Sequence, residues 1–404
     1  MMRQKILALR QRPEVMLMCL AAAIPFSFAT WQALLNNFAI ERAAFTGADM
    51  GLLQGIREIP GLLAFAVVLL LLLVREQRLF YWMVVLMAAG TAVTGFFPSV
   101  LGLYLTTVLM SLGFHYQETL QSSLSLQWLP KNNAPEILGR IISTRSFAAI
   151  LSFAMVWLLS EKLALEYHWI YLAGAGISLL IVLGTAAFFP HFQAHIVQNK
   201  KLIVRRRYWL YYALTFMAGA RRQIFVVFAG FLMVEKFGLS VGTISLLFLL
   251  NATLNIFLAP KIGRMIVRWG ERRALICEYI GLIIVFYAYA VVETAWLAMI
   301  LYVLDHLFFA MAISIKTYFQ KIADPADIAS TAGVAFSINH IAAVILPVLL
   351  GVVWMISPAA VFFTGTGIAV ISLLLAFNIP TQPMPGQEVV FGRRIAGAVS
   401  TAKA

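Results

Sequence analysis

Residues 40–46 read Ile-Glu-Arg-Ala-Ala-Phe-Thr, and 194 positions later residues 234–240 read Val-Glu-Lys-Phe-Gly-Leu-Ser. Each stretch leads to a pair of leucines, at 52–53 and 246–247. The same shift of 194 places Gly139, Ser143, Ala148 and Ala149 on Gly333, Ser337, Ala342 and Ala343. Two matches at one offset indicate that the chain consists of two similar halves. Such an internal repeat is typical of carriers, in which one half rocks against the other around a central site.

The composition indicates a membrane protein. Of the 404 residues, 62% are hydrophobic and 12% are charged, whereas soluble domains carry about 25% charged residues. An apolar segment of about 20 residues can cross a bilayer as a helix. Twelve such spans are predicted at 14–38, 47–74, 79–97, 99–122, 140–160, 169–189, 208–232, 240–260, 274–292, 296–318, 328–352 and 356–378. The sequence therefore predicts an all-α integral membrane protein of twelve transmembrane helices in two pseudo-symmetric six-helix bundles.

The spans also predict the domain boundaries. Residues 1–189 form the expected N-terminal six-helix bundle, and residues 208–380 form the C-terminal one. Between them, residues 190–207 form a basic cytoplasmic linker. Residues 381–404 form a cytoplasmic tail.

The positive charge follows the topology. The net charge is +13, and 22 of the 30 Lys and Arg residues fall in loops on the side of the termini, against 3 on the opposite side. This asymmetry is the positive-inside pattern, so both termini are expected in the cytoplasm of a cell with a bacterial-type inner membrane. The expected partner of the basic surface is the lipid bilayer rather than a nucleic acid.

The sequence lacks the motifs expected for ATP hydrolysis, for a disulfide framework and for metal binding. It has no G-x-x-x-x-G-K-[ST] loop, so the energy for transport is expected from a gradient rather than from ATP. The two cysteines, Cys19 and Cys277, imply no disulfide framework. No HExxH motif or Cys/His cluster predicts a metal, and no cofactor is expected. The first apolar stretch reads as a span rather than as a cleavable signal peptide.

One local motif carries a family resemblance. Gly263 followed by Val-Arg-Trp-Gly-Glu-Arg-Arg at 267–273 is similar to the G-x-x-x-D-R-x-G-R-R motif of the major facilitator superfamily, with Val267 in place of the aspartate. The other copy of the motif is reduced to Arg-Glu-Gln-Arg at 75–78, which leaves the usual charge latch of that family without its residues. Together with the two halves and the basic linker, the chain resembles this family over nearly its whole length. The resemblance implies alternating access to one central site.

Charged and polar residues inside the spans are the candidates for that site. A helix rises about 1.5 Å per residue, so Arg57, Arg221 and Arg222 are expected near the membrane midplane. Because arginine matches carboxylate and phosphate groups, they predict a substrate with an anionic group. The predicted substrate-binding residues are Arg57, Arg221, Arg222, Asn251, Asn255 and His340.

Helix geometry separates neighbouring side chains. Adjacent residues point about 100° apart, so Arg221 and Arg222 are not expected to share a partner, and one of them is expected to face the cavity. The same geometry separates Arg57 from Glu58. The alternative for each arginine is a structural ion pair with Glu58 or Asp305.

Titratable residues predict coupling and gating. Asp305 and Glu58 are the candidates for proton coupling, since a buried carboxyl can take up a proton. His115 and Glu118 share a helix face, and Glu118 with Arg145 forms either a gate or a fixed ion pair. This pair has no charged counterpart in the second half.

The expected function is secondary active transport of a small organic solute, with an anionic group, by a monomer coupled to protons. An efflux pump for lipophilic drugs or lipid-like compounds is an alternative. A membrane-embedded acyltransferase-like enzyme is another, but its nucleophile and base cannot be assembled here, so no enzyme is expected. A transporter-like receptor without flux is the third.

Overall fold

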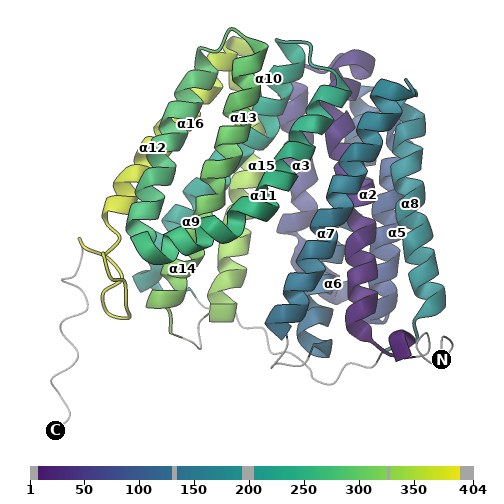
Figure 1. Ribbon diagram of the computed structural model, residues 1–404, viewed down its shortest axis with the longest axis horizontal. Helices are drawn as coiled ribbons and strands as arrows, with labels where there is room; N and C mark the ends of the chain where they lie inside the picture. The colour runs from purple at the N-terminus through teal and green to yellow at the C-terminus, as the bar shows by residue number, and fades with distance from the viewer. Residues whose placement is uncertain (1–7, 130–133, 193–203, 325–327, 392–404) are drawn as a thin grey trace. The chain divides into compact units, whose positions relative to one another are not determined.

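The computed structural model describes residues 8–129, 134–192, 204–324 and 328–391, and in these ranges every regular element is a helix (Figure 1). The chain divides into two compact units, which we call unit 1 and unit 2. Unit 1 comprises Met1–Gln198 with Gly238–Thr253, and unit 2 comprises Asn199–Phe237 with Leu254–Ala404.

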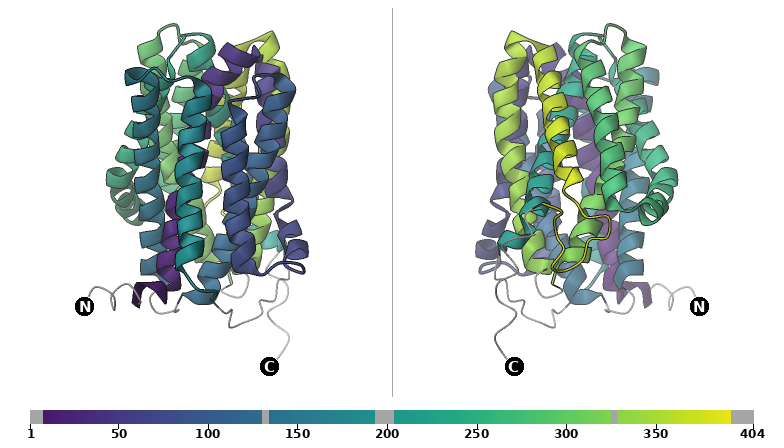
Figure 2. Two further views of the ribbon diagram at one scale, coloured as in Figure 1. Left: turned by 90° about the vertical axis from the view of Figure 1, so that its right-hand side faces the viewer. Right: turned by 90° about the vertical axis from the view of Figure 1, so that its left-hand side faces the viewer.

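Unit 1 is a bundle of long helices whose sides lie against one another (Figure 2, left). Helix α2 packs against α5, α6, α7 and α8, and α6 packs against α3 and α5. The elements are α2 (Pro13–Ala43), α3 (Gly47–Leu62), the 3₁₀ turn η1 (Ala64–Ala66), α4 (Val67–Leu70), α5 (Glu76–Thr94), α6 (Val100–Trp128), α7 (Ala134–Trp157), the π-helical turn η2 (Leu158–Lys162) and α8 (Tyr167–Phe188).

Unit 2 is built from α9, α12, α15 and α16, with shorter helical pieces between them. Helix α9 packs against α15 and α16, and α12 packs against α13, α14 and α16. The elements are the 3₁₀ turn η3 (Arg206–Tyr208), α9 (Trp209–Gln223), the π-helical turn η4 (Ile224–Ala229), α10 (Gly230–Glu235), α11 (Val241–Trp269), α12 (Glu271–Ala290), α13 (Ala295–Phe309), the 3₁₀ turn η5 (Ala310–Ala312), α14 (Ile313–Ile322), α15 (Ile328–Ile356) and α16 (Pro358–Phe377). Helix α11 begins in unit 1 and ends in unit 2.

The helices confirm an integral membrane protein. Among the described residues, nine helices are long and apolar enough to cross a bilayer. The other three predicted spans, at 47–74, 79–97 and 99–122, coincide with the helical segments α3–α4, α5 and α6. The count of twelve crossings stays a prediction for these three.

Two glycines let α5 and α6 approach closely. A Cβ atom on Gly90 would meet the backbone of Met110, and a Cβ on Gly113 would meet the backbone of Met87. Small residues of this kind allow helix backbones to pack tightly inside a bilayer. The contact explains why α5 and α6 form an extensive helix pair although both surfaces are apolar.

The start of α11 is held by the turn η2, which follows α7. The Glu161 carboxylate accepts hydrogen bonds from the Ser240 hydroxyl at 2.6 Å and from the Gly242 amide at 3.1 Å. Asn37 of α2 donates to the Leu239 carbonyl at 2.8 Å. An acceptor at a helix N-terminus satisfies amides that have no intrahelical partner and interacts favourably with the helix dipole.

We expect Glu161→Ala to lower the free energy of unfolding by about 1 kcal/mol, because α11 loses this cap. The matched control is Glu166→Ala, whose carboxylate is 70% exposed and faces His168; its effect should stay within about 0.5 kcal/mol. Denaturant unfolding of the purified variants measures both. Equal effects for the two substitutions would show that the cap contributes nothing.

The segment after α16 folds back on unit 2. We call residues 378–391 the terminal loop. Asn378 accepts from the Val390 amide at 2.9 Å and, through its side chain, from the Phe391 amide at 2.6 Å. Tyr318 of α14 donates to the Glu388 carbonyl at 2.5 Å. In the right-hand view of Figure 2 this yellow segment turns back beside the helices of unit 2.

Candidate functional site

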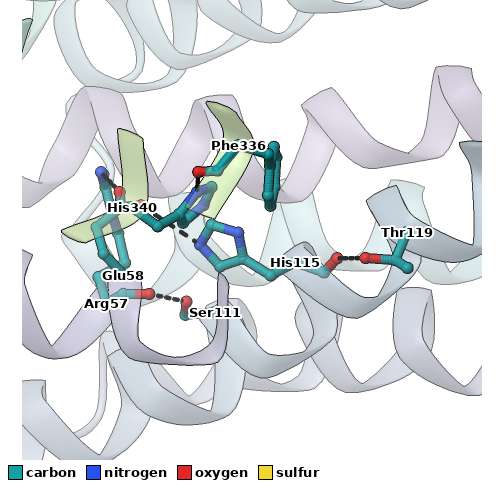
Figure 3. A network of polar contacts seen from close by, with 7 residues as sticks. All are labelled: Arg57, Glu58, Ser111, His115, Thr119, Phe336 and His340. Atoms are coloured by element: carbon teal, nitrogen blue, oxygen red, sulfur yellow. Dashed lines mark hydrogen bonds and ion pairs between the residues drawn. The ribbon is translucent and has the colours of Figure 1, made fainter. Parts of the chain in front are cut away.

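The predicted residues of unit 1 meet between α3 and α6. Arg57 and Glu58, 8% and 7% exposed, form an ion pair through the guanidinium Nε and Nη2. The Nε–Oε1 distance is 3.1 Å. His115 lies with its Nε2 atom 3.9 Å from the other Glu58 oxygen. We call these three side chains the Arg57 cluster; Figure 3 shows them with Ser111, whose hydroxyl donates to the Arg57 carbonyl.

The Arg57–Glu58 pair corrects one expectation. Helix geometry predicted that adjacent side chains point apart, yet these two are in contact. The direction of the Cβ atoms does not fix where a long side chain ends, and the guanidinium bends back to the neighbouring carboxylate. The arginine thus uses two of its three nitrogens, Nε and Nη2, on Glu58.

The predicted pair between Glu118 and Arg145 is present. Both terminal guanidinium nitrogens contact one Glu118 oxygen, at 3.1 and 3.2 Å. The side chains are 35% and 34% exposed, and the guanidinium also lies 6.0 Å from the centre of the Phe114 ring. This pair joins α6 to α7 inside unit 1. Its role as a gate stays a prediction.

Two buried amides in unit 1 have unused hydrogen-bonding groups. Asn251, in the first part of α11, is 3% exposed, and Gln117 of α6 is fully buried. In both residues the amide oxygen and nitrogen have no partner in the described part of the chain. Asn251 was predicted as a binding residue, whereas Gln117 was not among the predicted residues.

Arg221 lies in an ion pair inside unit 2. Its Nη2 atom is 3.3 Å from Glu278 of α12, and both side chains have no exposed surface. The guanidinium also stacks over the Tyr279 ring, 4.3 Å from its centre. Such a stack adds a cation–π attraction. The alternative partners predicted for Arg221 were Glu58 and Asp305, but the contact is made with Glu278.

Asp305 belongs to the same group. It is 1% exposed, and its charge interacts with those of Arg221 and Glu278. The Asp305 Oδ1 and Glu278 Oε2 atoms have no hydrogen-bond partner among the described residues. We call Arg221, Glu278 and Asp305 the Arg221 cluster. The signal that could have revealed Glu278 is that it is the one charged residue in the span 274–292.

The other predicted residues of unit 2 are spread over its helices. Arg222 is exposed, so the two adjacent arginines point apart as helix geometry predicts. Asn255 is also exposed. His340 is 5% exposed, and its Nδ1 lies 2.9 Å from the Phe336 carbonyl one turn earlier in α15 (Figure 3). Arg57, Glu58, His115 and Asn251 therefore belong to unit 1, and the remaining binding and coupling candidates belong to unit 2.

The two motif regions differ in structure. Glu271, at the start of α12, pairs with Lys321 of α14 at 2.7 Å beside a pocket of about 360 Å³. In the shortened copy, Gln77 holds the chain after α8: its amide donates to the Pro190 carbonyl at 3.0 Å and accepts from the Phe192 amide at 2.8 Å. Partial burial and the charges of Arg75 and Arg78 lower the pKa of His191 in this connection. Gln77, a neutral side chain, thus connects α5 to the segment after α8.

The C-terminal part of the chain is similar to a known protein family. Residues 211–398 match a family model described as Major Facilitator Superfamily. A search of curated proteins found no match to the sequence.

The fold resembles solved transporter structures over most of the chain. The nucleoside transporter NupG, in a mutant form, has a TM-score of 0.75 at 16% identity, covering 90% of this chain and 98% of that one. A bacterial homologue of the human lysosomal transporter Spinster has a TM-score of 0.74 at 12% identity, covering 90% and 95%. A POT family transporter in complex with 5-aminolevulinic acid has a TM-score of 0.69 at 12% identity, with the same coverage. At such identities the likeness establishes the fold.

Proposed function

We propose that this chain, whose residues 211–398 match the Major Facilitator Superfamily model, is a transporter of that family that carries a small organic solute with an anionic group across the inner membrane. The fold is that of secondary transporters of small solutes. The proposed cycle is alternating access, in which a central site opens to one side of the membrane at a time. Proton coupling through Asp305 and Glu58 completes the proposal, with both termini on the cytoplasmic side.

The Arg57 cluster is the observation that supports an anionic group. Its arginine is almost fully buried, and its bonds to Glu58 use the Nε and Nη2 atoms. Arg221 pairs with Glu278 through Nη2, and its Nε and Nη1 have no hydrogen-bond partner among the described residues. A guanidinium nitrogen that the neighbouring carboxylate does not use, in a buried site, suits a carboxylate or phosphate oxygen. His115 beside it can take up a proton when a second negative charge enters. The POT family transporter of similar fold is in complex with 5-aminolevulinic acid, which has a carboxylate group.

A neutral polar solute is the second candidate, because of the buried amides. Asn251 and Gln117 each offer both a donor and an acceptor with no protein partner within the described residues. A buried amide without hydrogen-bond partners is unfavourable by about 1–3 kcal/mol. A bound solute with hydroxyl and carbonyl groups would supply the missing partners. Nucleosides, which the related NupG transports, are solutes of this kind.

A ligand panel tests the two candidates. We expect an anionic metabolite to raise the melting temperature of the purified protein, because a ligand that binds the folded state stabilises it. Arg57→Gln removes a charge-assisted hydrogen bond worth about 1.5–3 kcal/mol, so roughly ten- to a hundredfold more ligand should be needed for the same shift. Arg145→Gln is the matched control, because it changes another Arg–Glu pair of unit 1.

Each alternative has its own outcome in this panel. Stabilisation by nucleosides or sugars that Asn251→Leu abolishes would favour the neutral solute. Stabilisation by lipophilic cations alone would contradict the anionic proposal and favour efflux of lipophilic compounds. Uptake of the stabilising compound into proteoliposomes then distinguishes a carrier from a receptor without flux.

A further inference from the structure

A pocket of about 360 Å³ lies in unit 2 between the end of α11, the start of α12 and α14. Its lining combines apolar and polar residues: Gly263, Ile266, Val267, Glu271, Ile313, Thr317, Gln320 and Lys321. Val267 and Ile313 are 85% and 43% exposed, so the apolar part of the lining continues onto the outer surface. A Cβ atom added to Gly263 would meet no atom within 4 Å, so the glycine leaves room that a larger side chain could fill.

The carboxylate in the pocket is already neutralised. The Lys321 ammonium lies 2.7 and 2.9 Å from the two oxygens of Glu271. The Glu271 side chain is 4% exposed, whereas that of Lys321 is 51% exposed. The ion pair therefore holds an ammonium group at the mouth of the pocket, and its acid does not repel an anion.

Three more cations border the pocket. Arg264 and Arg268 directly follow two lining residues of α11, and Lys316 directly precedes a lining residue of α14. All three are exposed, and none of them forms an ion pair with a residue in the described part of the chain. Long cationic side chains can extend along an apolar surface to place the charge at its edge. The border of the pocket thus has an excess of three positive charges.

The pocket lies at one end of three membrane-spanning segments. The apolar span in α11 ends at Leu258, the span of α12 begins at Glu271, and the span that includes α14 ends at Ile322. The charge asymmetry of the loops predicts that this end faces the cytoplasm. Anionic lipid headgroups lie at that level, and basic pockets between transmembrane helices bind such headgroups.

We propose that this pocket binds one anionic phospholipid. Its phosphate interacts with Arg264, Arg268 and Lys316, and an acyl chain lies against Val267 and Ile313. The three excess charges favour an anionic lipid over a zwitterionic one, whose own cation would be repelled. A free phosphate ion would leave the apolar part of the lining exposed to water, which is why a lipid fits the pocket better.

Native mass spectrometry of the purified protein tests the site. Wild-type protein is titrated with phosphatidylglycerol and with phosphatidylcholine of the same acyl chains, and we expect one phosphatidylglycerol molecule to bind more tightly. Gly263→Phe should abolish this binding, because the ring fills the pocket. The matched control is Gly367→Phe on α16, which also has no atom within 4 Å of an added Cβ and should keep the bound lipid.

Substitutions of the bordering cations keep the test independent of the glycine. Arg264→Gln and Lys316→Gln should each weaken phosphatidylglycerol binding about fivefold, which corresponds to about 1 kcal/mol per cation. Lys236→Gln is the control: it removes one charge from the same unit, at a site where the lysine pairs with Glu293 at 3.0 Å. Its affinity for the lipid should remain that of wild type. Melting temperatures without added lipid verify that every variant is folded.

Three outcomes would overturn the lipid site. Equal affinity of wild-type protein for the two phospholipids would show that the charge excess selects nothing. Unchanged phosphatidylglycerol binding by Gly263→Phe would place the lipid elsewhere on the protein. Inorganic phosphate that displaces phosphatidylglycerol, and that stabilises wild type but not Gly263→Phe, would make the occupant a soluble anion.

Discussion

Arg221→Met should lower the free energy of unfolding by about 3–5 kcal/mol, the largest single effect expected in unit 2. The substitution removes the cation that pairs with the buried Glu278 carboxylate, and it removes the stack on Tyr279. Taking one partner out of a buried pair leaves the other charge without compensation, whereas replacing both partners by apolar residues is often nearly neutral.

The double variant Arg221→Met/Glu278→Met tests this explanation more directly, because it replaces both partners of the pair. We expect it to recover at least half of the stability that the single variant loses. Unfolding in mixed detergent, followed by circular dichroism, measures both. A single variant within about 1 kcal/mol of wild type would mean that the ion pair is replaceable by water, contrary to its complete burial. Arg145→Met, in a pair that is about one-third exposed, serves as the comparison and should have a small effect.

Gly113→Val should destabilise unit 1 by about 1–3 kcal/mol or more, and Gly90→Val should do the same. At both positions the new Cβ would enter the backbone of the facing helix, not a movable side-chain end. Helices α5 and α6 would have to separate along their whole contact, with the loss of the packing that holds them together in a bilayer.

Glycines on α8 provide the matched control for this pair. Gly176 and Gly184 have no atom within 4 Å of an added Cβ, so valine there should change stability by no more than about 0.5 kcal/mol. Melting temperatures of the four variants, in one detergent, give the comparison. Equal losses at all four positions would show that helix propensity, rather than the close approach of α5 and α6, determines the effect.

The length and apolarity of the spans were enough to predict an all-helical membrane protein with this fold. The break into α13 and α14 could not be read from the sequence, because residues 310–312 are as apolar as their neighbours. Likewise, the assignment of residues 238–253 to unit 1 depends on contacts such as Glu161 with Ser240, and the repeat in the sequence contains no information on them.

The candidate site was predictable in part, for a physical reason. The pair of Glu118 and Arg145 follows from helix faces on consecutive spans, and the structure has it. The bond from Arg57 to Glu58 does not follow, because a long side chain has more reach than its helical direction suggests. Glu278 was not among the predicted residues, and its complete burial depends on packing between helices.

The terminal loop has a consequence for how this chain can vary during evolution. Its fastening uses main-chain atoms of Glu388, Val390 and Phe391, which any residue other than proline supplies. Two side chains, those of Tyr318 and Asn378, make these bonds, and Gly386 has a φ of 83°, which favours glycine. Variation at the other positions of residues 379–391 can therefore be wide, while selection for the loop acts on Tyr318, Asn378 and Gly386.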